Sequence, residues 1–491
     1  MMFFSTRDPE QKLYPASQVI KQGLANDGGL FVPDSIPTIT LEQIAELADM
    51  SYPEKAATIL SKFLSDYTYD ELLEDAQAAY SEISFPDGAA PLKKVKDGMY
   101  SLELWRGPTA AFKDMALQIM PRLLSRALVK TGEKNTALIL VATSGDTGKA
   151  ALEGHKDVDK VKIMVFYPVD GVSKVQKLQM VTQTGSNVNV CAIKGNFDDA
   201  QTGVKKIFSD PEAKAKLLEN GYVLSSANSI NWGRLAPQIV YYFHSYCELL
   251  RTKEISIGEK INVCVPTGNF GNIFAAYLSK LMGLPIEKMV CASNSNNVLT
   301  DFISTGVYDR NRNFHLTMSP SMDILISSNL ERLLYFTAGT EKTAEYMNQL
   351  NTFGRYKVSD DVKIKIADNF VGYCADEQET ADTLREIYNG GYLADTHTSV
   401  AFCCAEKYLS DFDDKTKMVV VSTASPYKFA ADVYKSITGE NANEGTAALD
   451  QLSALTDTEI SYPLKDLDKR NVNFDTVIDS DRMLEEVYKF M

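Results

Sequence analysis

Short apolar segments alternate with stretches of helical spacing through the middle of the chain. The strand-like segments are residues 136–142, 161–167 and 187–193. This alternation predicts parallel strands joined by crossover helices. Two later segments, 261–265 and 418–421, are continuous apolar runs that end in Pro, Gly, Ser or Thr, as strands buried on both faces do. Because ligands of open α/β sheets lie at the carboxyl ends of the strands, the loops after these segments are candidate site loops.

The first ninety or so residues lack this alternation and look helical, for example at 41–47 and 54–64. Residues 439–459 are polar and small and give mixed signals. We therefore predict a mostly helical N-terminal domain, a core with a smaller nested α/β subdomain, and a C-terminal extension. The expected bounds are 1–95 for the N-terminal domain, 96–438 for the core, about 131–235 for the nested subdomain and 439–491 for the extension.

Composition and charge exclude several classes of function. The chain has 491 residues, room for two to four domains of roughly 100–200 residues each. Its 50 Lys and Arg against 65 Asp and Glu give a net charge of −15, so no overall positive field attracts nucleic acid or anionic lipid. No apolar run approaches the ~18 residues of a membrane span, and the N-terminus does not read as a secretory signal. We expect neither a nucleic-acid partner nor a membrane partner.

The cysteines and histidines indicate the compartment and argue against a metal site. Seven cysteines occur without a Cys-x-x-Cys pair, which favours reduced thiols and a cytoplasmic location. The four histidines are far apart and form no zinc-binding spacing. We expect no bound metal, so the chemistry must come from other residues.

The first candidate for chemistry is Lys113, in the segment ELWRGPTAAFKDMALQ at 103–118. Thr109 is the expected N-cap of a helix, which places Lys113 in its first turn. An ammonium near the positive end of a helix and beside apolar residues is disfavoured, which lowers the amine pKa and frees it for imine formation. The alternative is an ordinary solvated lysine, which most helical lysines are.

Three further loops follow predicted strands. In VPTGNFGN at 265–272, a strand, glycines and a helix start would present free amides that suit a phosphate monoester; the alternative is a tight turn. The loop ATSGDTGKA at 142–150 lacks the Gly and the Ser or Thr that a nucleotide-binding P-loop requires, but its hydroxyls and amides suit a carboxylate. In VVVSTASPYKF at 419–429, Ser422 and Thr423 either face a ligand or simply end the strand.

Taken together, these segments resemble threonine synthase, a pyridoxal 5′-phosphate (PLP) enzyme of fold type II. The resemblance also includes STRD at 5–8, DGGLFVP at 27–33, SINWGRLAPQ at 229–238, DTHTS at 395–399 and STASP at 422–426. The matching blocks span almost the whole chain short of the last sixty residues. The resemblance implies an α/β fold like that of tryptophan synthase β, with parallel-rich sheets, helices on both faces and a mostly helical N-terminal domain.

The resemblance also implies roles for the matching positions. Lys113 would be the catalytic residue, linked to the PLP aldehyde as an imine and moving protons. The other cofactor-binding residues would be Gly268, Asn269, Phe270, Gly271 and Asn272 at the phosphate, Thr423 at the pyridine nitrogen and Asp146 near the 3′-oxygen. The substrate-binding residues would be Thr143, Ser144, Gly145, Thr147, Ser229, Asn231 and Arg234. A domain-fixing ion pair is the alternative for Arg234, and Lys428 is a further local donor for an anionic substrate.

The implied reaction converts O-phospho-L-homoserine and water to L-threonine and phosphate by β,γ-replacement, the last step of threonine biosynthesis. The alternatives are a related lyase, such as a serine or threonine dehydratase or a phospholyase that yields 2-oxobutyrate, and a silent binding protein that keeps the fold. A monomer or a homodimer is expected. Arg106, Ser425 and Tyr427 depart from the pattern of the family, and we place these departures at the rim of the pocket.

Overall fold

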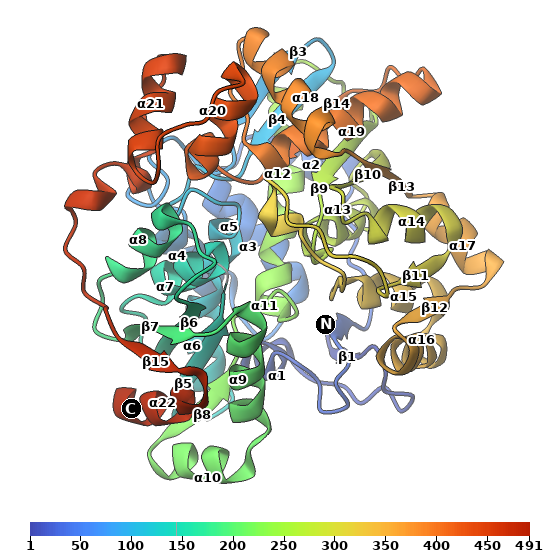
Figure 1. Cartoon of the computed structure of the whole chain (residues 1–491). Coiled ribbons are helices and arrows are strands. Elements are labelled where there is room, and N and C mark those ends of the chain that lie inside the picture. The colour runs from blue at the N-terminus through green and yellow to red at the C-terminus, as the bar shows by residue number, and fades with distance from the viewer. Residues whose placement is uncertain (144) are drawn as a thin grey trace.

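The computed structural model describes residues 1–143 and 145–491, which form two parallel-rich sheets with helices around them (Figure 1). The larger sheet has six strands, of which only β3, at one edge, is antiparallel to its neighbour. The strand order is β13 (Phe370–Cys374), β10 (Ile286–Ser293), β9 (Ile261–Pro266), β14 (Met418–Ser422), β4 (Met99–Glu103) and β3 (Leu92–Lys96). The two late apolar runs are thus confirmed as strands, and they pair with each other at the centre of this sheet.

The smaller sheet contains the three strands predicted in the middle of the chain. They pair side by side and all five strands are parallel. The order is β15 (Val477–Asp479), β7 (Val188–Lys194), β6 (Val161–Pro168), β5 (Thr136–Ala142) and β8 (Tyr222–Ser225). The sequence pattern therefore predicted the strands and their direction correctly, whereas it did not indicate the two edge strands.

Helices cover both faces of each sheet, as the alternation of side chains along the strands shows. Cys264 and Val420 face one hydrophobic cluster, which includes residues of α19 (Thr396–Phe412). Their neighbours Val263 and Val421 face the main core on the other side. The remaining helices of this part are α13 (Gly271–Leu281), α14 (Val298–Thr305), α15 (Leu330–Ala338), α16 (Thr340–Phe353), α17 (Asp360–Ala367) and α18 (Glu377–Asn389), with the antiparallel pair β11 (Val307–Asp309) and β12 (Arg355–Lys357).

The smaller sheet shows the same alternation. Leu138 and Phe166 face a cluster with Ile207 of α9 (Phe197–Ser209), while Ile139 and Val165 face the main core. The helices connected to this sheet are α6 (Met120–Lys130), α7 (Asp146–His155), α8 (Lys174–Val181), α9, α10 (Pro211–Glu219), α11 (Trp232–Leu235) and α12 (Pro237–Arg251).

The N-terminal part is mostly helical, as predicted. Its helices are α1 (Ala16–Gln22), α2 (Leu41–Ala48), α3 (Tyr52–Phe63) and α4 (Tyr69–Ala79). Three of them begin with a capping box in which Thr40, Ser51 and Thr68 cap the first turn, an arrangement that satisfies two otherwise free amides. A short antiparallel pair, β1 (Phe3–Ser5) with β2 (Phe31–Pro33), was not expected.

The STRD block joins this N-terminal part to the rest of the molecule. Thr6 donates to the Glu331 carboxylate at 2.6 Å, and Arg7 forms an ion pair with the same carboxylate at 2.7 Å. Helices α2 and α3 also pack on α12. The hydrophobic core consequently continues from the N-terminal helices into the sheets.

The C-terminal part runs along one edge of the molecule, from α20 (Ala430–Thr438) and α21 (Ala447–Thr456) to β15 and α22 (Met483–Phe490) (Figure 1). Strand β15 pairs with β7, and α22 packs on α9. The C-terminal segment from α20 to α22 therefore runs from the part of the molecule with the larger sheet to the edge strand of the smaller sheet. Among the described helices, none is both long and apolar enough to cross a membrane.

Candidate active site

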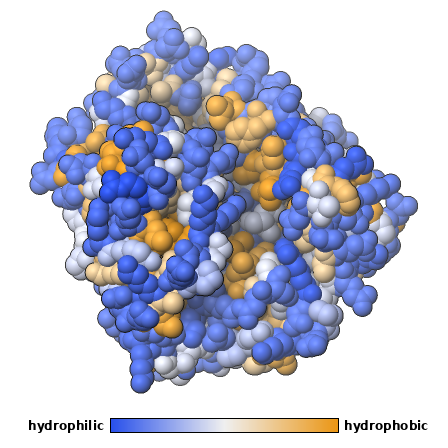
Figure 2. Space-filling view, turned by 60° about the horizontal axis from the view of Figure 1, so that its bottom comes forward, coloured by the Kyte–Doolittle hydropathy of each residue, from blue (hydrophilic) through white to orange (hydrophobic). Residues whose placement is uncertain are grey.

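The predicted site residues follow the carboxyl ends of strands from both sheets. Thr423 follows β14, the glycine-rich segment 268–272 follows β9, and Gly145 follows β5. The Phe112 amide donates to the Thr423 carbonyl at 2.8 Å, and the Ser425 amide donates to the Ala110 carbonyl at 3.1 Å. These bonds place the segment that carries Lys113 directly beside Thr423. One face of the molecule is hollowed between two mainly hydrophilic halves, and hydrophobic residues gather on the walls of this hollow (Figure 2).

Lys113 lies at a helix start, but the helix begins later than the sequence indicated. Its first residue is Asp114, in α5 (Asp114–Leu117), and Lys113 is the N-cap. The predicted N-cap, Thr109, instead donates to the Asp114 carboxylate through its amide at 2.8 Å and its hydroxyl at 2.7 Å. The Thr109 prediction was wrong because this pairing holds the intervening residues as a turn.

The Lys113 side chain is buried, only 10% exposed, so it is not a solvated surface lysine. Its Nζ lies 3.7 Å from Oδ2 of Asp146 and 4.9 Å from the centre of the Phe112 ring. Burial lowers the pKa of Lys113 to about 8; the Asp146 carboxylate opposes this, whereas the cations of Lys428 and Arg234 add to it. More of this amine is therefore free near neutral pH than of an ordinary lysine, and the free form is the one that acts as a nucleophile.

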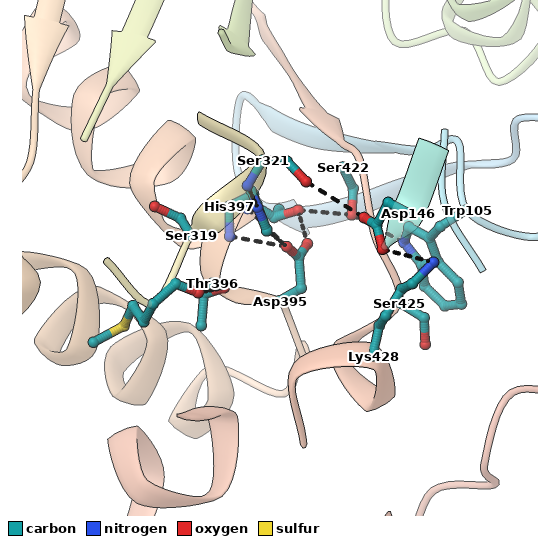
Figure 3. Close-up of polar contacts among 12 residues, drawn as sticks. Trp105, Asp146, Ser319, Ser321, Asp395, Thr396, His397, Ser422, Ser425 and Lys428 are labelled. Carbon is teal, nitrogen blue, oxygen red and sulfur yellow. Dashed lines mark hydrogen bonds and ion pairs between the residues drawn. The ribbon is translucent and has the colours of Figure 1, made fainter. Parts of the chain in front are cut away.

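Asp146 is the centre of a buried polar network (Figure 3). Its Oδ1 pairs with Lys428 Nζ at 2.9 Å and accepts from Gln176 Nε2 at 2.8 Å. Its Oδ2 accepts from the Ser321 hydroxyl at 3.3 Å. Burial by itself would raise the pKa of Asp146, but Lys428 and Lys113 hold it well below its ordinary value. The carboxylate is thus ionised throughout the neutral range. Nothing in the sequence pointed to Gln176 or Ser321.

The segment 268–272 has the features of an anion cradle. Phe270 has a left-handed backbone (φ 61°) and is the N-cap of α13, and the amides of 268–272 donate to no backbone carbonyl among the described residues. A Cβ on Gly268 would lie 2.8 Å from the Ser321 carbonyl oxygen. Asn272 Oδ1 accepts from two tyrosine hydroxyls, while its buried Nδ2 has no partner in the described part of the chain. Free amides and an unpaired donor fit a phosphate group at a helix N-terminus.

A second segment holds this cradle from outside. Ser327 donates to the Gly268 carbonyl at 2.7 Å, and Asn329 donates to the Asn269 carbonyl through both its amide and its side chain, each at 3.0 Å. Arg332, fully buried, donates to Asn329 Oδ1 at 2.5 Å. No sequence motif indicated these three residues, because none belongs to a pattern of its own.

The loop after β5 is shaped by its own side chains. Thr143 Oγ1 accepts from the Gly145 and Gly148 amides, each at 2.9 Å. Gly145 has φ 141°, a backbone that favours glycine, and a Cβ there would lie 2.5 Å from the Gln176 side chain. Thr147 is half-buried in the first turn of α7. The remaining predicted residue of this loop, Ser144, lies outside the described residues.

The three predicted substrate residues near α11 differ in what they can offer. Asn231 donates to the Ile20 carbonyl at 2.9 Å and accepts from the Gly233 amide at 2.9 Å, so its side chain is used to hold the helix start. Ser229 is half-buried and lies 3.4 Å from Asn329 Nδ2. Arg234 is buried and donates to the Ala227 carbonyl at 2.7 Å.

Arg234 has no carboxylate partner among the described residues, so the ion-pair alternative finds no support there. Burial lowers the pKa of Arg234 to about 10, and its charge acts on Lys113. A buried guanidinium without a counter-ion is costly unless an anion binds it. Arg234 is therefore the predicted substrate residue best placed to receive a phosphate or carboxylate.

Two of the three residues expected at the rim, Ser425 and Tyr427, contact the C-terminal part of the chain. Ser425 is 2.6 Å from the Ser461 hydroxyl, and the Tyr427 hydroxyl donates to the Thr458 carbonyl at 2.7 Å. Both side chains point to the C-terminal part, so they hold that part in place and do not form a pocket rim. Arg106 stacks on Trp105 and pairs with Glu103 and Asp87. Lys428, predicted as a local donor for an anionic substrate, is fully buried and paired with Asp146.

The DTHTS block supports the network from the opposite side. Asp395 accepts from His397 Nδ1 at 2.9 Å, and His397 Nε2 accepts from the Ser321 amide at 3.1 Å. The Thr398 hydroxyl donates to Ser422 Oγ at 3.0 Å. Figure 3 shows His397 and Asp395 next to Ser321. The block thereby holds the backbone of Ser321 while its hydroxyl contacts Asp146.

Comparison with known proteins agrees with this geometry. The family "Pyridoxal-phosphate dependent enzyme" matches residues 91–424, "Threonine synthase N terminus" matches 2–80, and "Threonine synthase, C-terminal" matches 398–483. Threonine synthase of Pseudomonas aeruginosa is 38% identical, with 90% of this chain and 91% of that protein covered. A crystal structure of PLP-bound threonine synthase from Brucella melitensis has a TM-score of 0.88 and 36% identity, covering 100% of this chain and 99% of that one.

Another relative is longer than this chain. Threonine synthase-like 1 of Macaca fascicularis is 39% identical over 91% of this chain, and the match spans 62% of that protein's length. The similarity to the bacterial enzyme nevertheless covers both proteins almost from end to end. The chain belongs to the threonine synthase family of fold type II pyridoxal-phosphate-dependent enzymes.

Proposed function

We propose that the protein is a threonine synthase that uses PLP to convert O-phospho-L-homoserine and water to L-threonine and phosphate. One observation carries this proposal. A buried lysine with a lowered pKa follows β4, and a helix start with free amides and an unpaired donor follows β9, on the other side of β14 in the same sheet. These are the two attachments that a phosphorylated aldehyde cofactor needs. The family membership of the chain supports the same assignment.

The proposed cofactor contacts use groups that the fold leaves free. Lys113 would provide the covalent attachment, and the amides of 268–272 together with Asn272 Nδ2 would bind the phosphate. The Thr423 hydroxyl would face the pyridine nitrogen, and Asp146 would lie on the side of the 3′-oxygen. When bound, PLP supplies an electron sink for carbanions at the α and β carbons of an amino acid.

The residues of the chain would divide the remaining work. The Lys113 amine, with its pKa near neutrality, can accept a proton from one carbon atom and return it to another. Asp146 stays ionised, and its charge, 3.7 Å from the Lys113 amine, favours the protonated form of that amine. A threonine hydroxyl can form a hydrogen bond with the pyridine nitrogen, but unlike a carboxylate it does not keep that nitrogen protonated. The ring is then a weaker electron sink, so the protein must control where negative charge accumulates on the substrate.

The substrate has two anionic ends, and the protein offers two kinds of donor. Arg234 would bind the γ-phosphate, since a guanidinium is suited to bidentate phosphate contacts. Gly145 and Thr147 would face the α-carboxylate at the start of α7, while Ser229 would support the phosphate. Ser144 is proposed as a substrate-binding residue from the family resemblance alone. The geometry gives less support to Asn231 and Thr143, whose side chains already hold the backbone.

The test is product analysis with purified protein, PLP and O-phospho-L-homoserine. We expect L-threonine and inorganic phosphate in equal amounts. Formation of 2-oxobutyrate with phosphate would instead identify a phospholyase, and an absence of both products would indicate a binding protein. L-Serine and L-threonine offered as substrates would reveal a dehydratase by the 2-oxo acid each yields.

Three further points belong to the same proposal. A cytoplasmic location is supported by the seven cysteines, which are all free. A monomer or homodimer is proposed. The division into an N-terminal domain at 1–95, a core at 96–438 with its nested subdomain, and an extension at 439–491 is proposed as well, and the end of α20 at Thr438 supports the last boundary.

A further inference from the structure

A second buried lysine lies on the far side of the carboxylate that faces Lys113. Lys428 comes from the short helix η2 (Pro426–Phe429), and its side chain is 0% exposed. Its Nζ lies 2.9 Å from Oδ1 of Asp146, while Oδ2 of the same carboxylate lies 3.7 Å from Lys113 Nζ. One carboxylate therefore stands between two ammonium groups and is closer to the one that has no role in the proposed chemistry. Figure 3 shows the pairing of Asp146 with Lys428.

We propose that Lys428 is a positioning residue that acts through Asp146: by binding one carboxylate oxygen closely, it prevents a tight ion pair between Asp146 and Lys113 and keeps the Lys113 amine free. This inference rests on the proposed function only in one respect, namely that the free Lys113 amine is used to bind PLP. The electrostatic relation among the three groups holds for the protein whatever its substrate.

The orientation of Lys428 is fixed by other contacts. Its Nζ also donates to the Thr109 carbonyl at 3.0 Å, in the turn that leads to Lys113. Asp146 is held in turn by Gln176 and Ser321. The carboxylate consequently cannot move toward Lys113 without losing its hydrogen bonds to three partners on three different segments.

The charged groups that act on Lys113 come from four elements. Asp146 on α7 and Asp114 on α5 favour the ammonium, whereas Lys428 on η2 and Arg234 on α11 disfavour it. Burial raises the pKa of Asp114 to about 6, and two hydrogen bonds from Thr109 hold that carboxylate. Removing the Lys428 cation leaves Asp146 with Lys113 as its nearest cation. The pKa of the Lys113 amine must then rise.

The experiment measures the Lys113 amine directly in the full-length, cofactor-free protein. Trace acetic anhydride is added at a series of pH values, and acetylation of the peptide that contains Lys113 is measured by mass spectrometry. Only the free amine reacts, so the midpoint of the profile reports its pKa. For Lys428→Met we expect the midpoint to move to higher pH and labelling at pH 7 to fall about tenfold, as loss of one nearby cation implies.

Lys149→Met is the matched control. Lys149 is also buried and lies on α7, but it pairs with Glu153 at 2.9 Å and is not among the charges that act on Lys113. We expect it to leave the profile of Lys113 unchanged. Lys428→Arg, which keeps the charge, should restore the wild-type midpoint. An unchanged midpoint in Lys428→Met, or an equal shift in Lys149→Met, would overturn the inference.

A variant of opposite sign provides a check if Lys428→Met folds poorly. Asp146→Asn removes the carboxylate and keeps its shape, so two cations then act on Lys113 without compensation. Its midpoint should move to lower pH, with faster labelling at pH 7; a shift to higher pH would contradict the inference. Neither result depends on turnover, so the inference can hold even where no threonine is formed, and it can fail in an active enzyme.

Discussion

Asn272→Asp is the perturbation that tests the anion cradle most specifically. Asn272 Oδ1 accepts from Tyr241 at 2.7 Å and from Tyr242 at 2.5 Å, and Nδ2 is buried without a partner in the described structure. Aspartate keeps the shape and both accepted hydrogen bonds. It replaces only the free donor, which we propose as a phosphate ligand, with a second acceptor oxygen.

The expected loss follows from that single group. A hydrogen bond to a charged partner is worth about 1.5–3 kcal/mol, which corresponds to roughly 10- to 150-fold in affinity at about 1.4 kcal/mol per tenfold. Repulsion between the new carboxylate and a phosphate dianion adds to this loss. PLP should therefore bind at least about tenfold more weakly, as measured by equilibrium dialysis with the purified apoprotein.

Pyridoxal, which lacks the phosphate, is the control ligand. Its affinity should be nearly the same in the wild type and in Asn272→Asp, because the change acts only on the phosphate end. Urea unfolding of both proteins shows whether the fold has kept its stability. An equal loss of affinity for pyridoxal and PLP would refute the assignment of this helix start to the phosphate.

Three other expectations concern separate parts of the structure. Arg234→Gln should raise the KM for O-phospho-L-homoserine by about 10- to 100-fold, the loss of one charged contact, and should change PLP affinity far less. Steady-state kinetics and equilibrium dialysis with PLP measure the two effects. Burial lowers the pKa of His155 to about 4, below its value of about 6.5 in the unfolded chain. As the pH falls, the unfolded chain therefore takes up the proton first. The free energy of unfolding should then fall between pH 6.5 and pH 4, by at most about 1.4 kcal/mol per pH unit. His155→Gln should flatten that slope in chemical denaturation. Tyr427→Phe removes the hydrogen bond to Thr458 and should speed proteolysis of the C-terminal part, whereas unchanged cleavage would show that this contact does not hold it.

The central strands could be predicted from sequence because each is a continuous apolar run with its own boundary signals. Residues 136–142 and 261–265, for example, coincide with β5 and β9 to within one residue. The edge strands β8 and β15 could not be predicted, because they are stabilised by hydrogen bonds to neighbouring strands of the sheet and not by an apolar run of their own. The helix near Lys113 begins later than predicted because Thr109 donates to the Asp114 carboxylate and does not cap the helix. Amino-acid composition does not decide between these two hydrogen-bond patterns.

The candidate site was only partly accessible to sequence reasoning. Lys113 and the segment 268–272 lie in motifs with a local chemical meaning, so their place at strand ends could be inferred. The pairing of Lys428 with Asp146 and the contact of Ser321 with His397 join segments far apart in the chain. No periodicity or motif encodes such contacts. The departures at Ser425 and Tyr427 were visible, but their partners in the C-terminal part were not.

The most direct test of the account is borohydride reduction of the purified protein loaded with PLP, followed by peptide mapping. We expect a visible absorbance band that disappears on reduction, with the reduced cofactor attached to the peptide of Lys113. A Lys113→Ala variant should fold, lack the band and show no labelled peptide. Labelling of another lysine, or a band that persists in Lys113→Ala, would contradict the central claim.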